Sequence, residues 1–275
     1  MRVRRRYLPP GWYPGAEEKA REAIENMERS IKPEPARGIA GIVPHAGWEF
    51  SGGLAFEVLS RISRTMDTIV IIGGHLGPAD GILCAFEDSY ETPFGLVPAD
   101  LELLAAIRAA VPVTEDRSAD NTVEVQLPFV KYLFPLAKVL GMRASPSLEA
   151  DRLGKALAEA ARGLGRKVGV AGSTDLTHYG SSYGFAPAGS GNRALRWVKE
   201  VNDHRIIESL LAMEFDTALE RALSERSACS AGGALAALSF ARENGVREGK
   251  LLRYSTSFDV HPGDSFVGYA GILYS

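Results

Sequence analysis

Short apolar segments alternate with helical segments along most of this chain, and this alternation constrains the fold more than any other feature. Four apolar segments are typical of buried strands, at 38–43, 68–72, 137–142 and 167–171. Helices are expected around and between them, at 16–31, 53–62, 99–110 and 151–164. Strands that alternate with helices form a largely parallel sheet with helices on both faces. The sequence therefore predicts the α/β class.

The same pattern continues to the end of the chain. Further helices are predicted near 192–212, 215–223 and 232–244, and the mostly apolar residues 266–273 predict a final buried strand. A chain of 275 residues is long enough for one large domain or two small ones. Since no repeat, low-complexity tract or Ser/Gly linker divides it, we expect a single domain over 1–275.

Composition argues against several classes of function. With 31 Lys and Arg against 34 Asp and Glu, the net charge is −3, so the chain as a whole does not attract nucleic acid or an anionic membrane. The only basic cluster, at positions 2, 4, 5 and 6, is interpreted as solvated. No apolar segment is long enough to cross a membrane, and Tyr7 and two prolines follow the basic start where a signal peptide would have an apolar core. We expect no nucleic-acid or membrane partner and a cytoplasmic location.

Three of the five histidines, His45, His75 and His178, each follow a predicted strand by a few residues, in a glycine-rich turn. Ligands bind beyond the carboxyl ends of strands in open α/β sheets, so parallel strands would bring these imidazoles to one edge. A single loop histidine usually does no more than make a hydrogen bond, but three in this position favour a shared site. Asp175 lies three residues before His178, close enough to line the same pocket or fix the tautomer of a neighbouring imidazole.

The two cysteines are too few for a disulfide framework. Cys229 lies in a turn of small residues just before a predicted helix, whose dipole would favour the thiolate of a nucleophile or metal ligand. A small packing residue is an equally good interpretation of Cys229 alone, and Cys84 is interpreted as a buried hydrophobe. Two imidazoles and a thiolate at one sheet edge would suit Fe(II), Zn(II) or Cu, and the thiolate argues against magnesium or calcium.

Short motifs are spread through nearly the whole chain, at residues 11–14, 44–48, 51–52, 73–75, 92–95, 124–129, 173–180, 229–232 and 265–270. This ordered set resembles the Memo family, which is related in fold to the class III extradiol (LigB-like) ring-cleaving dioxygenases. The resemblance implies a three-layer α/β/α domain with a pocket like an active site. Bacterial and archaeal Memo relatives are often described as component B of an Amme-Memo-radical-SAM system, which implies Amme-type and radical-SAM partners.

The resemblance also implies roles for individual residues. In the ring-cleaving relatives two His and a Glu hold Fe(II), and another His acts as acid and base. By this resemblance a metal, Fe(II) or alternatively Cu or Zn, would be held by His45, His75 and Cys229, with Cys229 in the position of the Glu. The catalytic groups would be His178 and Asp175, and substrate would be bound by Trp48, Asn121 and Ser173.

Two departures argue against catechol cleavage. Asn121 lies just upstream of the 124–129 motif, where the family usually has a His, and an amide cannot shuttle a proton near neutral pH. A thiolate ligand such as Cys229 also makes an iron site softer and exposes the sulfur to oxidation. We therefore expect catechol ring cleavage to be absent or very slow.

Three functions remain open at this point. The chain could be a metal-dependent redox enzyme of the non-haem iron or copper type that acts on a small molecule. It could instead be a metal-free hydrolase or transferase, with Cys229 as nucleophile and His178 as base. The third function is a binding protein that engages a peptide, small molecule or metal without turnover, because a fold alone rarely fixes function.

Overall fold

Four parallel strands form the centre of the main sheet in the computed structural model, which describes residues 1–275. In spatial order they are β2 (Ala40–Val43), β9 (Val168–Ser173), β3 (Thr68–Gly73) and β8 (Lys138–Ala144). These are the four strands that the apolar segments predict. Their register aligns Ile42, Gly172, Ile72 and Met142 across the sheet. All four strands therefore end at the same edge, where the histidine-containing turns begin.

Shorter and antiparallel strands extend this parallel centre on both sides. Beside β2 lies β12 (Phe266–Tyr274), which pairs antiparallel with β2, with β11 (Lys250–Thr256) and with β10 (His178–Tyr179). Beside β8 lies the antiparallel β4 (Ile82–Cys84), followed by β7 (Thr114–Glu115). A separate small sheet contains β1 (Val3–Arg4), β5 (Ser89–Thr92) and β6 (Gly95–Pro98). The main sheet as a whole is therefore mixed, with a parallel centre.

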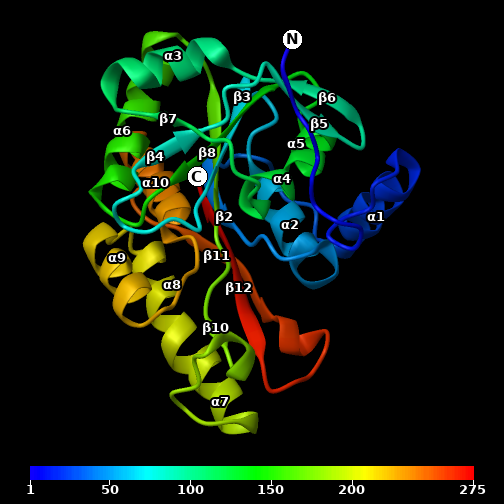
Figure 1. Ribbon diagram of the computed structural model, residues 1–275, viewed down its shortest axis with the longest axis vertical. Helices are drawn as coiled ribbons and strands as arrows, with labels where there is room; N and C mark the ends of the chain where they lie inside the picture. The colour runs from blue at the N-terminus through cyan, green and yellow to red at the C-terminus, as the bar shows by residue number, and fades with distance from the viewer.

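Helices cover both faces of the main sheet, which gives the expected three layers (Figure 1). One face packs against α3 (Leu101–Ala110), α6 (Leu148–Gly163), α8 (Asp203–Leu211), α9 (Phe215–Ser224) and α10 (Ala231–Glu243). The other face packs against α1 (Glu17–Ser30), α2 (Gly53–Arg61) and α5 (Leu127–Leu133). The remaining helices are α4 (Asn121–Glu124) and α7 (Gly191–Trp197). None of the helices combines the length and apolar character needed to span a membrane.

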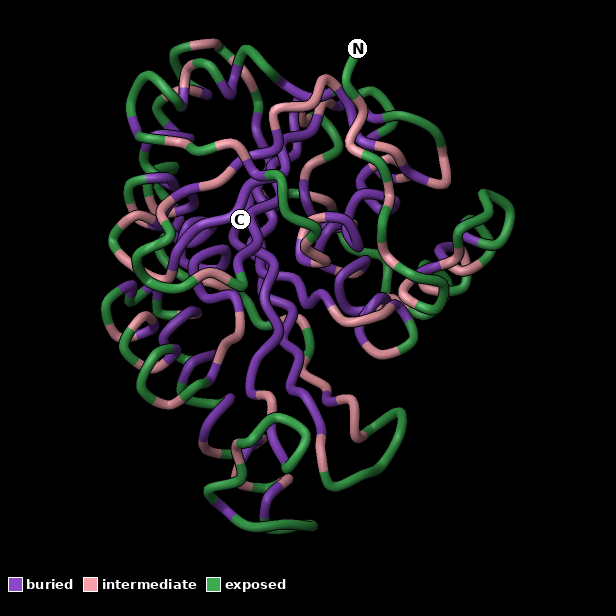
Figure 2. The backbone as a smooth tube through the Cα atoms, viewed as in Figure 1, coloured by how far each residue is buried: buried purple, intermediate pink, exposed green.

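The core lies on both sides of the central strands, as the buried backbone in Figure 2 shows. In β3, Val70 and Ile72 pack toward α6 and α10, whereas Ile69 and Ile71 pack toward α2 and α5. Burial on both faces explains why this strand is apolar at successive positions and does not alternate. By contrast, most of β11 is exposed or only half-buried, so its sequence carries no such apolar run.

Two helical segments contain a turn of π-helix. The predicted helix near 192–212 is one continuous helical run in which π-helical residues Val198–Asn202 join α7 to α8. The second π-helical turn, Trp48–Gly52, precedes α2 and begins three residues after His45. Such turns are rare and are often found at functional sites.

The basic N-terminal cluster is not simply solvated, which corrects the interpretation from the sequence. Arg4 is partly buried, donates to the backbone oxygen of Asp116 at 2.5 Å and pairs with Glu87 at 3.5 Å. Arg2 and Arg5 also meet carboxylates. The cluster thus holds the first strand against acidic residues that lie far away in the sequence.

A buried carboxyl group lies at the start of α8. Asp203 is fully buried and accepts hydrogen bonds from the Thr177 backbone N–H at 3.1 Å, the Thr177 hydroxyl and the Tyr254 hydroxyl at 2.7 Å. Burial raises the pKa of Asp203 to about 7, although these hydrogen bonds act in the opposite direction.

The raised pKa of Asp203 predicts that the free energy of unfolding decreases as pH rises. An Asp in an unfolded chain has a pKa of about 3.9, so between that value and pH 7 the folded chain binds more protons, and stability is lost as pH rises. Asp203 should contribute a slope of up to ~1.4 kcal/mol per pH unit. Urea denaturation at several pH values should give a flatter profile for Asp203→Asn, which stays neutral. Equal slopes in the variant and the parent would contradict this prediction.

Candidate metal centre and its cavity

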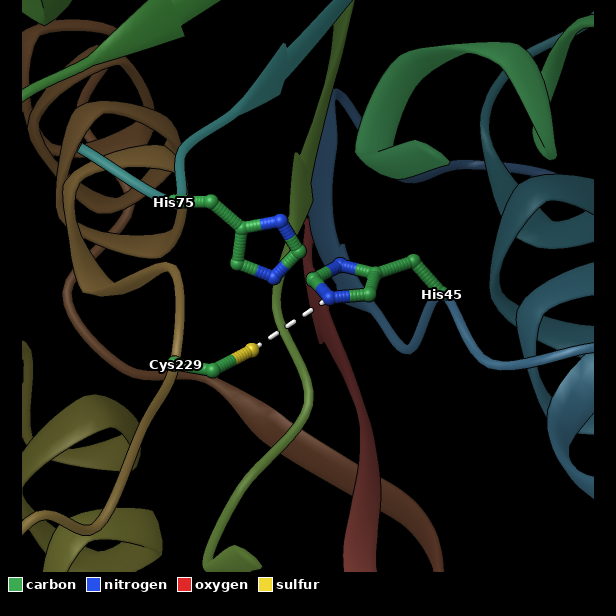
Figure 3. A group of neighbouring side chains, drawn as sticks. All are labelled: His45, His75 and Cys229. Atoms are coloured by element: carbon green, nitrogen blue, oxygen red, sulfur yellow. Dashed lines mark hydrogen bonds between the residues drawn. The ribbon is translucent and has the colours of Figure 1, made fainter. Parts of the chain in front are cut away.

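His45 follows β2 and is almost fully buried at the carboxyl edge of the sheet. Its backbone N–H donates to Asp175 Oδ1 at 2.7 Å, and its ring Nδ1 lies 3.1 Å from the Ser173 hydroxyl. The other ring nitrogen, Nε2, lies 3.3 Å from the sulfur of Cys229 (Figure 3). Residues of β9 and its following turn therefore orient His45 toward the cysteine.

His75 lies two residues after β3 and approaches the same point from the neighbouring strand. Its φ of +57° is a left-handed backbone conformation that is uncommon for a residue other than glycine and is often found at functional sites. Nδ1 lies 3.1 Å from Asp120 Oδ2, while Nε2 points toward His45 and Cys229 (Figure 3).

Close packing at the start of α10 positions Cys229. A Cβ atom at Gly232 or Gly233 would clash with the backbone oxygens of Ala144 and Ile72, at the ends of β8 and β3. Glycine is therefore required for α10 to begin directly against the sheet edge. The Cys229 N–H also donates to the backbone oxygen of Asp175 at 3.2 Å.

These three side chains together form a group that could hold one metal ion. One ligand atom from each of His45, His75 and Cys229 lies within 4.8 Å of the other two. Ligand bonds of about 2.0 to 2.3 Å place donors around one ion about 3 to 4 Å apart, so small side-chain movements would suffice. The convergence expected from the strand ends is therefore found.

Burial shifts the pKa values of two of these donors, His45 and Cys229. Burial and then the nearby His75 lower the pKa of His45 to about 3, so its imidazole is neutral. Burial and then the charge of Asp175 raise the pKa of the Cys229 thiol. The metal-free protein therefore favours the thiol of Cys229 and not the thiolate expected at a helix start. A coordinating metal would remove the thiol proton.

A cavity of about 660 Å³ opens beside this group. It is lined by all three of the predicted strand-end histidines and by aromatic side chains, including Trp12, Phe50, Tyr183 and Tyr269. No Lys or Arg lines it. A cavity of this size and character accommodates a small organic molecule better than a phosphorylated or multiply anionic one.

His178 lines this cavity from the start of β10. Its Nδ1 lies 3.2 Å from the backbone oxygen of Leu176, and its ring packs edge-on against Tyr183 at 4.9 Å between centroids. Burial lowers the pKa of His178, with the charge of Asp175 acting in the opposite direction, so the neutral ring can accept a proton.

Asp175 lines the cavity, as expected, and its hydrogen bond goes to His45 and not to His178. Its carboxylate accepts the His45 N–H, and Leu176 provides the hydrogen-bond partner of His178. Burial raises the pKa of Asp175 to about 6. Asp175 therefore helps to position His45, and it acts on His178 through its charge.

Of the three residues expected to bind substrate, only Asn121 lines the cavity. Its amide N–H already donates to the His45 backbone oxygen at 3.1 Å. Ser173 is buried beside His45. Trp48 is also buried, donates to the Val125 backbone oxygen at 3.1 Å and stacks on Phe129, so Trp12 rather than Trp48 faces the cavity.

Two polar residues of the site, His261 and Asp120, are not singled out by the sequence. His261 lies at the cavity and pairs with Glu49 at 2.8 Å, a contact between segments too distant in sequence to be predicted. Asp120 precedes a short helix and accepts the Thr122 N–H at 3.0 Å, which is the ordinary role of an N-cap. No sequence signal separates that capping role from its contact with His75. His204, by contrast, is exposed on α8 and pairs with Glu208.

The raised thiol pKa predicts slow alkylation of metal-free Cys229. Each unit of increase lowers the thiolate fraction at neutral pH about tenfold, so iodoacetamide should react with Cys229 at least ~10-fold more slowly than with glutathione at pH 7. The rate should still be rising at pH 10. Mass spectrometry of Cys84→Ala assigns the modification to Cys229, and a rate equal to that of glutathione with a plateau near pH 8 would contradict the prediction.

Comparison with known proteins places these features in a family. The family model described as Memo-like protein matches residues 5–273. A MEMO1 family protein of Pyrococcus abyssi is 36% identical over 252 residues, which cover 85% of this chain and 86% of that protein. Another, of Thermococcus onnurineus, is 33% identical and covers 96% of each chain. The crystal structure of an uncharacterized Escherichia coli K12 protein superposes with a TM-score of 0.55 at 14% identity, covering 87% of this chain and all of that one, which shows similarity of fold alone.

Proposed function

This chain belongs to the Memo family, and from that premise we propose that it is a metal-dependent redox enzyme acting on a small organic molecule. The metal would be held by Nε2 of His45, Nε2 of His75 and Sγ of Cys229. The observation that carries the proposal is the convergence of these three donors beside a cavity large enough for a substrate.

The donor set fits a borderline-soft metal. Two imidazole nitrogens and one sulfur suit Fe(II), Zn(II) or Cu, and they suit magnesium or calcium poorly. Three protein ligands leave coordination positions open, as catalytic metal sites require. When bound, iron or copper would supply redox chemistry at the edge of the cavity.

His178 is the best candidate for a general base in this cavity. Leu176 accepts from Nδ1, which fixes the tautomer whose Nε2 is free to take a proton from a bound molecule. The edge-on contact with Tyr183 restricts the orientation of the ring. Because no Lys or Arg lines the cavity, we propose that the substrate is an uncharged or weakly charged small molecule.

The other functions receive less support from the geometry. For a thiol hydrolase, the imidazole beside Cys229 is His45 and not the expected His178, and the pKa values of that pair favour a neutral thiol and a neutral ring. A protein that binds a peptide or small molecule without turnover would use the same cavity. Amme-type and radical-SAM partners remain part of the proposal through family resemblance. A cytoplasmic location also remains part of it, on the sequence features already described.

We predict that protein purified without oxygen retains Fe(II), Zn(II) or Cu in near-stoichiometric amounts. Cys229→Ala should weaken Zn(II) binding at least ~10-fold, because a thiolate contributes strongly to the affinity of such sites. Cys84→Ala is the matched control, since Cys84 is buried away from the group. Equal metal content in the two variants, measured by elemental analysis, would exclude Cys229 as a ligand.

A second prediction separates catalysis from metal binding. His178→Gln should slow metal-dependent oxygen uptake with an active small-molecule substrate by ~100-fold or more, as expected for loss of a general base, while Zn(II) affinity is retained. His204→Gln, on the exposed face of α8, should behave as the parent does. Absence of turnover with the parent across a broad substrate panel would favour the binding-protein function instead.

A further inference from the structure

We infer that Asp120 is a positioning residue for the candidate metal centre, because it fixes the tautomer of His75 that presents Nε2 to the other two donors. This inference rests on the proposed metal-binding function. It assigns to Asp120 a role beyond its position at the start of α4, and it explains how the least buried of the three donors is held in place.

The argument begins with hydrogen-bond chemistry. Asp120 Oδ2 lies 3.1 Å from His75 Nδ1, and the Asp120 side chain is only 9% exposed. An ionised carboxylate can only accept hydrogen bonds, so Nδ1 of His75 must carry the proton. In a neutral imidazole the second nitrogen then has a free lone pair. That nitrogen, Nε2, is the one that points toward His45 and Cys229 in Figure 3.

The carboxylate itself is rigidly held. Its second oxygen, Oδ1, accepts from both the N–H and the hydroxyl of Thr122, which fixes the orientation of the side chain. Arg143 Nη1 lies 3.5 Å from Oδ2 and favours the anionic form. Arg143 is in turn fixed by two hydrogen bonds to Asp116, at 2.7 and 2.8 Å. This chain of contacts connects β8 to the ring of His75.

The His75 ring depends on a hydrogen-bond partner to hold its orientation. Its side chain is 37% exposed and its backbone is in the left-handed region, so burial alone does not restrain it. His45, by contrast, is buried and meets a serine hydroxyl, which can either donate or accept. Asp120 is the one carboxylate that hydrogen-bonds a ring nitrogen of this group. Carboxylates in this position orient metal-binding imidazoles and raise their basicity.

The next residue, Asn121, helps to hold the other histidine of the group, His45. Asn121 donates to the backbone oxygen of His45 at 3.1 Å. Residues 120 and 121 together therefore contact both imidazole residues, which come from the ends of different strands.

Two substitutions separate positioning from helix capping. Asp120→Ser keeps a good N-cap residue but is too short to reach His75. Asp120→Asn keeps the cap and the size, but its amide would donate to Nδ1 and favour the tautomer with the proton on Nε2. Asp80→Asn is the matched control, because Asp80 lies in the turn after His75 and contacts the Gly77 N–H. A capping role alone predicts that both Asp120 variants behave as the parent does.

The experiment measures Zn(II) affinity and the nitrogen-15 NMR signals of His75 in metal-free protein. We expect both Asp120 variants to bind Zn(II) ~10- to 100-fold more weakly, with Asp80→Asn unchanged. We also expect the proton to lie on Nδ1 in the parent and to move to Nε2 in Asp120→Asn.

Parental Zn(II) affinity in both Asp120 variants, or a proton on Nε2 in the parent, would overturn the inference. If the parent binds no Zn(II), the proposed function fails, whereas the NMR signals still decide whether Asp120 fixes the His75 tautomer. Thermal melting by circular dichroism confirms that each variant is folded before either measurement.

Discussion

The packing of α10 against the carboxyl edge of the sheet is the constraint on which the site depends. Gly232 and Gly233 allow the first turn of the helix to touch the backbone at the ends of β8 and β3, where any side chain would clash. This contact brings Cys229 beside two histidines that are more than 150 residues earlier in the sequence. Without this contact, the start of α10 would lie farther from the strand ends, and the Cys229 thiol would no longer lie beside the two histidines.

Burial then gives the site its chemical character. It keeps the His45 ring neutral and the Cys229 thiol protonated in the metal-free protein, so these two donors carry no charge before a metal binds. The same burial argues against an activated thiol, because an imidazolium–thiolate pair would need the opposite pKa shifts. Asp175 supports this arrangement by accepting a hydrogen bond from the backbone N–H of His45.

The sequence predicts well those features that depend on local pattern. The four parallel strands, the flanking helices and the convergence of His45 and His75 follow from apolar segments that end in glycine-rich turns, and Cys229 joins them from the turn before a predicted helix. Strand β11 was missed because its half-exposed residues show no continuous apolar run. Short strands such as β4 and β7, of three and two residues, are too brief to leave a pattern.

Features that depend on contacts between distant segments could not be predicted. Trp48 belongs to a motif beside His45, yet its side chain turns into the core and Trp12 takes the position at the cavity. Asp120 has the sequence context of an ordinary N-cap, and only the fold brings it to His75. The position of Cys229 before a helix predicts a low thiol pKa, because a sequence shows neither the burial nor the nearby Asp175 charge that raise the pKa in the folded chain.

The central claim is that two imidazoles and one thiolate hold a single metal ion at this edge of the sheet. Anomalous X-ray diffraction from Zn(II)-loaded crystals tests it most directly. The account predicts one fully occupied peak about 2.0 to 2.1 Å from Nε2 of His45 and of His75 and about 2.3 Å from Sγ of Cys229. A zinc peak elsewhere in the protein, or one at this edge that lies beyond bonding distance of Sγ of Cys229, would contradict the claim.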